Sequence, residues 1–179
     1  KSKTTAAICC NNIATAYNYA GNNDEARWYY NKSIALYSNP SIALMKCYRR
    51  LGEVCLVQSA YGKAVEAYKN AIGVGLSLEG AEPTSGLIQC YTALAEIHCS
   101  QKSYESAIVC YYKQMEILGQ IQDKDIRQDL LQCAHKIAAL YEKEDRLVSA
   151  ISIYEHTCRQ LNLRSPAGEV TIYLSECYA

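Results

Sequence analysis

Small and apolar residues recur along this chain with the spacing of a helix-turn-helix unit. In one stretch a small residue, Gly52, lies twelve positions before another, Ala64, and Tyr68 follows four residues later. Residues three and four apart share one face of a helix. The spacing therefore predicts two helices that cross at Gly52 and Ala64, where the lack of bulk lets their backbones approach, with Tyr68 filling the space beside the contact.

The same template occurs four times. The other three sets keep the separations of twelve and then four residues: Ala14/Ala26/Tyr30, Ala95/Ala107/Tyr111 and Ala138/Ala150/Tyr154. The second small residue advances by 38, 43 and 43 residues along the series Ala26, Ala64, Ala107 and Ala150. An independent series has the same steps: Cys9, Cys47, Cys90 and Cys133. Two series in phase at such a period predict a solenoid of repeated helix pairs.

These motifs resemble the tetratricopeptide repeat. Steps longer than the usual 34 residues resemble the extended repeats of kinesin light chains, Pins-type polarity adaptors and the soluble attachment proteins of vesicle fusion. The resemblance implies an all-α fold, a right-handed α-solenoid of antiparallel helix pairs. We expect one solenoid over residues 1-179, read as a fragment of a longer chain, with repeats at about 4-38, 41-78, 84-122 and 125-163 and a terminal helix at 166-179.

Turn-forming residues mark the expected helix ends. Gly21, Asn22 and Asn23 are predicted to close the first helix, and Asp24 is predicted to cap the second. The glycine-rich stretch from Gly73 to Gly86 is interpreted as a connector, because no strand precedes it and no Gly-Lys-Ser/Thr follows, as a phosphate-binding loop would require. The helix beginning at Pro166 is either the first helix of a fifth repeat or a cap on the fourth.

Charge and cysteine content limit the classes of partner and the cellular compartment that we expect for this chain. Lys and Arg number 18 and so do Asp and Glu, giving zero net charge and no bulk attraction to nucleic acid. No run approaches the ~18 apolar residues of a membrane-spanning helix. The ten cysteines include no C-x-x-C pair, and we interpret the recurrent four as small buried hydrophobes, without metal or other cofactor. So many thiols favour a reducing compartment, the cytoplasm or alternatively the nucleus.

In the family that this chain resembles, ligands bind a concave wall formed by the first helix of each repeat. Carried over by position, the candidate peptide-binding residues are Asn11, Asn12, Thr15, Asn18, Lys46, Arg49, Arg50, Glu53, Gln89, Thr92, Glu96, Gln132, His135 and Lys136. Amide side chains can donate to and accept from a peptide backbone, and arginines can hold carboxylates in a bidentate geometry. The alternative is that these residues are simply solvated helix faces. Three asparagines in one helix disfavour helicity, which singles out Asn11, Asn12 and Asn18.

One family function can be tested directly on the sequence. The carboxylate clamp that grips acidic chaperone tails wants Lys and Asn in the first repeat, Asn in the second, and Lys and Arg in the third. Those places hold Asn11, Thr15, Arg50, Gln89 and Ala93. The clamp is absent, although a basic group still suggests a preference for acidic segments: Lys46, Arg49, Arg50, His135 and Lys136.

The sequence therefore favours a protein-interaction module, an adaptor or scaffold that binds a peptide segment of a protein partner in its groove. It contains no catalytic triad order, H-E-x-x-H or nucleotide-binding loop, so an enzyme acting on a small-molecule substrate is not expected. The alternative is a self-assembling or vesicle-fusion attachment-type scaffold that uses its convex surface and ends, and self-association is left open.

Overall fold

The computed structural model describes residues 3–78, 84–121 and 126–161, and every regular element in these ranges is an α-helix. In order, the helices are α1 (Lys3–Tyr19), α2 (Asn23–Leu36), α3 (Ile42–Val57), α4 (Tyr61–Leu76), α5 (Thr84–Ser100), α6 (Tyr104–Leu118), α7 (Ile126–Lys143) and α8 (Leu147–Gln160). The predicted all-α fold is confirmed. The predicted terminal helix at 166-179 lies outside the described residues.

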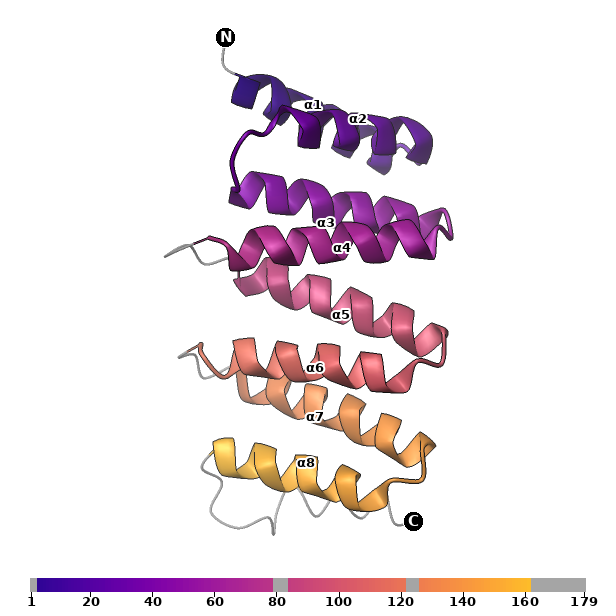
Figure 1. The fold of residues 1–179 in the computed structure, drawn as a ribbon, viewed down its shortest axis with the longest axis vertical. Helices are drawn as coiled ribbons and strands as arrows, with labels where there is room; N and C mark the ends of the chain where they lie inside the picture. Colours follow the sequence, from indigo (N-terminus) through magenta and orange to yellow (C-terminus); the bar gives the residue numbers. More distant parts are fainter. Residues whose placement is uncertain (1–2, 79–83, 122–125, 162–179) are drawn as a thin grey trace. The chain divides into compact units, whose positions relative to one another are not determined.

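The helices belong to two compact units, residues 1–97 and 98–179, with the boundary near the end of α5. In the first unit α1 packs on α2, α2 on α3 and α3 on α4, so that consecutive helices stack in chain order (Figure 1). In the second unit α6 packs on α7 and α7 on α8. Each unit is thus built by the nearest-neighbour packing of a solenoid.

The small residues of the predicted template are buried in all four repeats. They are Ala14, Ala26, Gly52, Ala64, Ala95, Ala107, Ala138 and Ala150. The tyrosines at the equivalent positions are also buried, from 0% exposed at Tyr30 to 4% at Tyr111. A Cβ added to Gly52 would lie only 2.8 Å from the ring of Tyr68. The glycine therefore lets this tyrosine ring lie directly against the α3 backbone.

Each helix pair turns over through the same hydrogen-bonded motif. After α1, Gly21 has φ +78°, its N–H donates to the carbonyl of Asn18, and the N–H of Asn22 donates to that of Tyr17. This is the Schellman ending, in which one residue takes the left-handed conformation. The equivalent residues with positive φ in the other three turns are Ser59, Lys102 and Asp145. Their numbers advance by the repeat steps, so the turn is a fixed part of the repeat.

Two predictions about helix ends were wrong in detail. Asp24 does not cap α2, because the helix begins one residue earlier and the Asp24 carboxylate instead accepts hydrogen bonds from Arg27 and Gln58, at 3.1 and 2.9 Å. The expected connector is also shorter, because α4 continues to Leu76 and α5 begins at Thr84.

Glycines of the expected connector serve helix packing instead. Gly75 lies in α4 and Gly86 in α5. A Cβ on Gly75 would lie 2.7 Å from Leu87 Cδ2, and one on Gly86 would lie 2.4 Å from Met45 Cε. Both glycines therefore make room for side chains that join α3, α4 and α5 in the first unit.

The recurrent cysteines confirm the packing interpretation, with one exception. Cys47, Cys90 and Cys133 are buried, and burial raises the pKa of Cys90 to about 12 and that of Cys133 to about 11. Cys9 is exposed, so the prediction of burial was wrong for the first member of the series. None of the described cysteines forms a disulfide bond.

Candidate functional site

The fourteen candidate residues all lie on first helices of the pairs, and none is buried. Those on the surface are Asn12, Lys46, Gln89, Glu96, Gln132 and His135. Those that are half-buried are Asn11, Thr15, Asn18, Arg49, Arg50, Glu53, Thr92 and Lys136. That they form a binding surface stays a prediction. Several of them make specific side-chain contacts within their own unit, and those of the first unit, on α1, α3 and α5, are called the wall.

The Thr15 hydroxyl of α1 joins Tyr30 of α2 to Arg50 of α3. The hydroxyl of Tyr30 lies 3.2 Å from Oγ1 of Thr15, and this Oγ1 accepts a hydrogen bond from the guanidinium of Arg50. Thr15 in turn donates to the carbonyl of Asn11 at 2.8 Å. A guanidinium carries five N–H donors, so this bond orients Arg50 while using one of them.

A second recurrent tyrosine, Tyr68 of α4, lies near Glu53 and Arg49 of α3. Burial raises the pKa of Tyr68, and the nearby carboxylate of Glu53 raises this pKa further. Glu53 also forms an ion pair with Arg49 one helical turn before it on α3. In the part of the chain that the structure describes, neither Lys46 nor Arg50 forms an ion pair. The α3 wall thus holds one neutralised cation and two uncompensated ones.

Asn11 is used in packing between α1 and α3. Its Oδ1 lies 3.4 Å from the thiol of Cys47, which donates to it. The same thiol lies 3.4 Å from the hydroxyl of Ser33, and this fully buried serine donates to the carbonyl of Ala7 at 2.8 Å. Asparagine has a low helix propensity, and at Asn11 its presence is explained by the bond that its side chain accepts from Cys47.

In the second unit, α7 and α8 form a pocket of about 190 Å³. It is lined by Gln128, Leu131, Gln132, His135 and Tyr154. Nδ1 of His135 lies 3.0 Å from the hydroxyl of Tyr154. Two predicted residues, Gln132 and His135, thus come together in one depression. The ammonium of Lys136 lies 5.3 Å from the ring centre of Tyr111 on α6, within cation–π distance.

Sequence reasoning missed three of the pocket residues. Gln128 and Leu131 lie one turn before the predicted residues on the same face of α7, and the i, i+3, i+4 spacing could have identified them. Tyr154 was identified only as a packing residue. In each unit a recurrent tyrosine places its hydroxyl beside a predicted residue, as Tyr30 does at Thr15 and Tyr154 at His135.

Among the described residues, no group of three or more His, Cys, Asp or Glu side chains is arranged to hold a metal ion. Within the same ranges, no helix is both long and apolar enough to cross a membrane.

Comparisons with known proteins agree with this architecture. Residues 6–38 match the family model described as tetratricopeptide repeat. No curated protein matches the sequence significantly.

Among solved structures, BtubC (BKLC) from P. vanneervenii is 16% identical with a TM-score of 0.72, and the match covers 94% of this chain and 69% of that one. The N-terminal domain of stress-induced protein-1 (STI-1) from C. elegans is 15% identical with a TM-score of 0.60, covering 74% and 98%. MamA is 16% identical with a TM-score of 0.62, covering 87% and 78%. At such identities the likeness shows the fold alone.

Proposed function

We propose that this chain, a tetratricopeptide-repeat protein, is an interaction module that binds an acidic peptide segment of a partner protein along the wall of α1, α3 and α5. The observation that carries the proposal is the charge arrangement on α3. Arg49 is paired with Glu53, whereas Arg50 is held in place by Thr15 and Lys46 is exposed, both without an ion pair in the described part of the chain. Oriented cations that lack a counter-ion are suited to carboxylates of a ligand.

The peptide backbone has partners on the same wall. Gln89 is exposed on α5, and Asn12 is exposed on α1. Amide side chains both donate and accept, so they can satisfy the N–H and C=O groups of an extended segment. Specificity for acidic segments would then come from Arg50 and Lys46, and general affinity from the amides.

We also propose that the module is not catalytic. Glu53 is already paired with Arg49, and Glu96 is exposed, so neither carboxylate lies in the desolvated pocket that general acid–base catalysis uses. Zero net charge and the acidic residue Glu96 on α5 argue against nucleic acid as the partner. Buried free thiols such as Cys90 and Cys133 support a reducing compartment, the cytoplasm or nucleus.

A charge-reversal experiment tests the groove. Cell extract is passed over immobilised wild-type chain, over Lys46→Glu/Arg50→Glu, and over Lys63→Glu/Lys69→Glu, and the captured proteins are identified by mass spectrometry. Lys63 and Lys69 are exposed on α4, so the control makes the same change of charge outside the wall.

We expect a partner that the wild type and the α4 control retain and the groove variant loses, with binding that weakens as salt is raised. The captured segment should be rich in Asp and Glu. Equal capture by all three proteins would refute the groove model and favour the alternative, a scaffold that uses its convex surface and ends.

A further inference from the structure

The charged side chains of α3 in the wall form two rows along the helix. Lys46 and Arg50 lie four residues apart and form one row, and Arg49 and Glu53 form the other. Arg50 reaches α1, where its guanidinium donates to the hydroxyl of Thr15. The row of Lys46 and Arg50 therefore lies on the α1 side of α3, and neither cation forms an ion pair within the described part of the chain.

The second row lies on the side of α3 that faces α4 and α5. A Cβ added to Gly52 would lie 2.8 Å from the ring of Tyr68 on α4, and Glu53 is the next residue of α3. Burial raises the pKa of the Cys90 thiol on α5, and of the two charges of the row Arg49 lowers this pKa and Glu53 raises it. The carboxylate of Glu53 accepts a hydrogen bond from Arg49 in their ion pair, so the row as a whole carries no net charge.

A carboxylate on α5 adds an uncompensated negative charge on this side. Glu96 holds in α5 the position that Glu53 holds in α3, one repeat step earlier. It is exposed, and it forms no ion pair in the ranges that the structure describes. Burial raises the pKa of Tyr68, and both carboxylates raise it further. Both therefore lie within electrostatic reach of one hydroxyl, where they outnumber the single cation Arg49.

Equivalent tyrosines of the first two repeats thus lie beside opposite charges. Tyr30 lies beside Thr15, which accepts the hydrogen bond from Arg50. Tyr68 lies beside the carboxylates, and the counterpart of Arg50 in α5 is the uncharged Ala93. The wall is therefore positive between α1 and α3 and negative between α3 and α5.

We propose that the partner segment carries the complementary order of charges, with acidic residues against Lys46 and Arg50 and a basic residue against Glu96. The inference rests on the proposed function, because it takes the wall as the peptide site and adds the order of charges along it. A segment that is acidic throughout would bring like charge to Glu96, and one that is basic throughout would bring like charge to Arg50, and both are unfavourable.

The packing of the first helices indicates how far apart the two kinds of residue lie. In the first unit successive first helices approach each other directly, α1 and α3 through Asn11 and Cys47, and α3 and α5 through Met45 and Gly86. Helices in contact lie ~10 Å apart and an extended segment advances ~3.3 Å per residue, so the acidic and basic residues should be about three positions apart.

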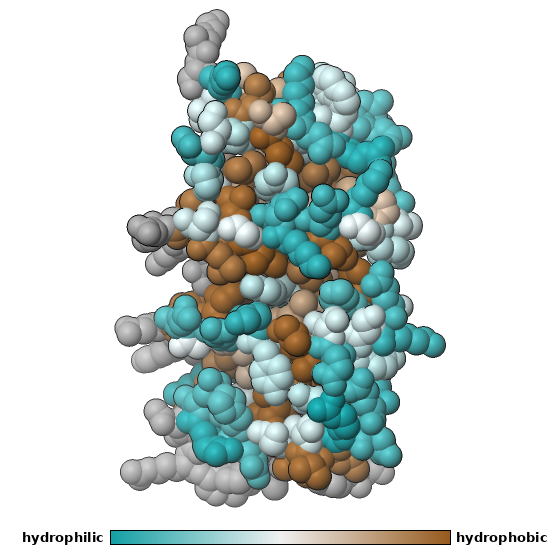
Figure 2. Space-filling view, viewed as in Figure 1, coloured by the Kyte–Doolittle hydropathy of each residue, from teal (hydrophilic) through white to brown (hydrophobic). Residues whose placement is uncertain are grey.

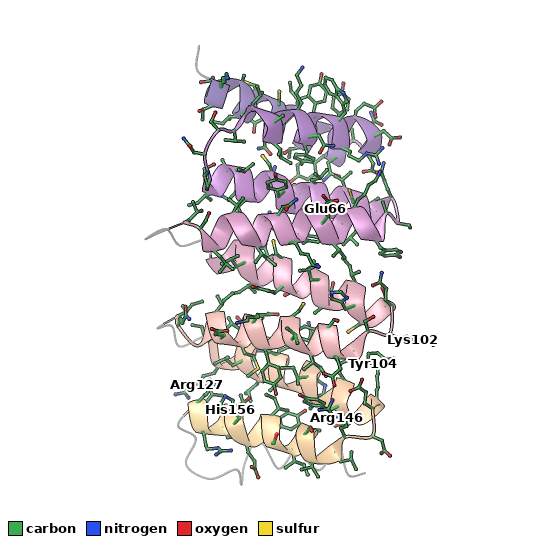
Figure 3. All side chains as sticks on the ribbon, viewed as in Figure 1. Glu66, Lys102, Tyr104, Arg127, Arg146 and His156 are labelled. Atoms are coloured by element: carbon green, nitrogen blue, oxygen red, sulfur yellow. The ribbon has the colours of Figure 1, made fainter. Side chains whose placement is uncertain are left out.

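A displayed library of random peptides tests the order of charges without knowledge of the natural partner. The library is selected separately on the immobilised wild-type chain, on Lys46→Glu/Arg50→Glu, on Glu96→Lys and on the control Glu66→Lys. Glu66 is exposed on α4 of the same unit, so the control makes the same change of charge as Glu96→Lys outside the wall. Hydrophilic side chains gather over α4 in Figure 2, and Figure 3 labels Glu66 on this helix. Circular dichroism checks that each variant remains folded.

We expect the wild type and the control to enrich peptides in which Asp or Glu lies about three positions from Lys or Arg. Selection on Glu96→Lys should replace the basic residue with an acidic or uncharged one. Selection on Lys46→Glu/Arg50→Glu should lose the acidic residues.

Titration calorimetry on one enriched peptide then tests the pairing itself. Replacing the basic residue of the peptide with Gln, or Glu96 of the chain with Gln, should weaken binding about two- to fivefold, as for an exposed ion pair. The two changes together should weaken it no further than either alone. Effects that multiply would show that the basic residue binds elsewhere, which would overturn the inference.

Other outcomes separate this inference from the proposed function. Enriched peptides that contain acidic residues alone, or a basic residue that Glu96→Lys still selects, would overturn the order of charges and leave the acidic-peptide site intact. Enrichment that is unchanged by Lys46→Glu/Arg50→Glu, or no enrichment on any of the proteins, would refute the peptide site and the order of charges with it.

Discussion

The turn after α3 should become more stable when its left-handed residue is replaced by glycine. Ser59 has φ 56°, a conformation that costs an L-residue about 1–2 kcal/mol. Glycine adopts it without that cost but loses about 0.5–1 kcal/mol more backbone entropy on folding. The difference leaves Ser59→Gly more stable than the wild type by about 0.5–1 kcal/mol.

Gly21 provides the reverse substitution at the equivalent position of the first repeat. A Cβ built there meets no atom within 4 Å, so Gly21→Ala adds backbone strain and no steric clash. We expect it to lower the free energy of unfolding by about 1 kcal/mol. Lys69→Gly, at an exposed site in α4, is the matched control, and a helix-interior glycine should cost about 1 kcal/mol there.

Urea unfolding followed by circular dichroism measures all three variants, which lie in the same unit. The expected order of stability is Ser59→Gly, wild type, then Gly21→Ala together with Lys69→Gly. If Ser59→Gly were as destabilising as Lys69→Gly, the left-handed conformation would carry no strain and the reasoning would fail. The same gain is expected at Lys102, which Figure 3 labels at the turn between α5 and α6.

Two further predictions concern the core. Ala107, fully buried on α6, should not accept a larger side chain, so Ala107→Leu should lower the free energy of unfolding by about 1–3 kcal/mol; an unchanged melting temperature would show that the helix register is wrong. Burial raises the pKa of Cys133 to about 11, so between pH 8 and 10 its thiol stays protonated in the folded state while the unfolded thiol, with a pKa of about 8.5, ionises. The unfolded state then binds fewer protons, and the wild type should lose about 2 kcal/mol more stability over this interval than Cys133→Ala. Parallel pH curves of urea unfolding for the two proteins would contradict the assignment of this pKa to burial.

The helix positions could be predicted because the same spacing of small residues and tyrosines recurs in all four repeats. Small residues at Gly52, Ala64 and their counterparts recur in phase with the cysteines, and an error in register would have placed the repeat tyrosines in solvent. The turns were harder to predict. Ser59 and Lys102 carry no local sign of positive φ, and Asp145 carries only the weak preference of aspartate for that region. Their repeat distance from Gly21 is what relates all three to a glycine turn. The shared hydrogen-bonded motif, rather than residue type, determines their conformation.

Candidate wall residues could be placed on the correct helices, but their bonding could not be foreseen. Whether Asn11 faces solvent or Cys47 depends on how far α3 lies from α1. Arg49 and Arg50 are adjacent in sequence, yet one is neutralised by Glu53 and the other is held by Thr15. Such differences arise from packing between repeats.

The turn motif also indicates where this chain tolerates insertions. From Gly21 to Ala26, and at each later turn, the left-handed residue precedes the small residue of the second helix by the same five positions. The five residues by which the longer steps exceed 38 must therefore fall outside this invariant segment. The repeats of this chain therefore differ in length where one helix pair passes to the next. A grafted epitope or an inserted domain should be accepted at those passages, whereas the same insertion between paired helices should prevent folding.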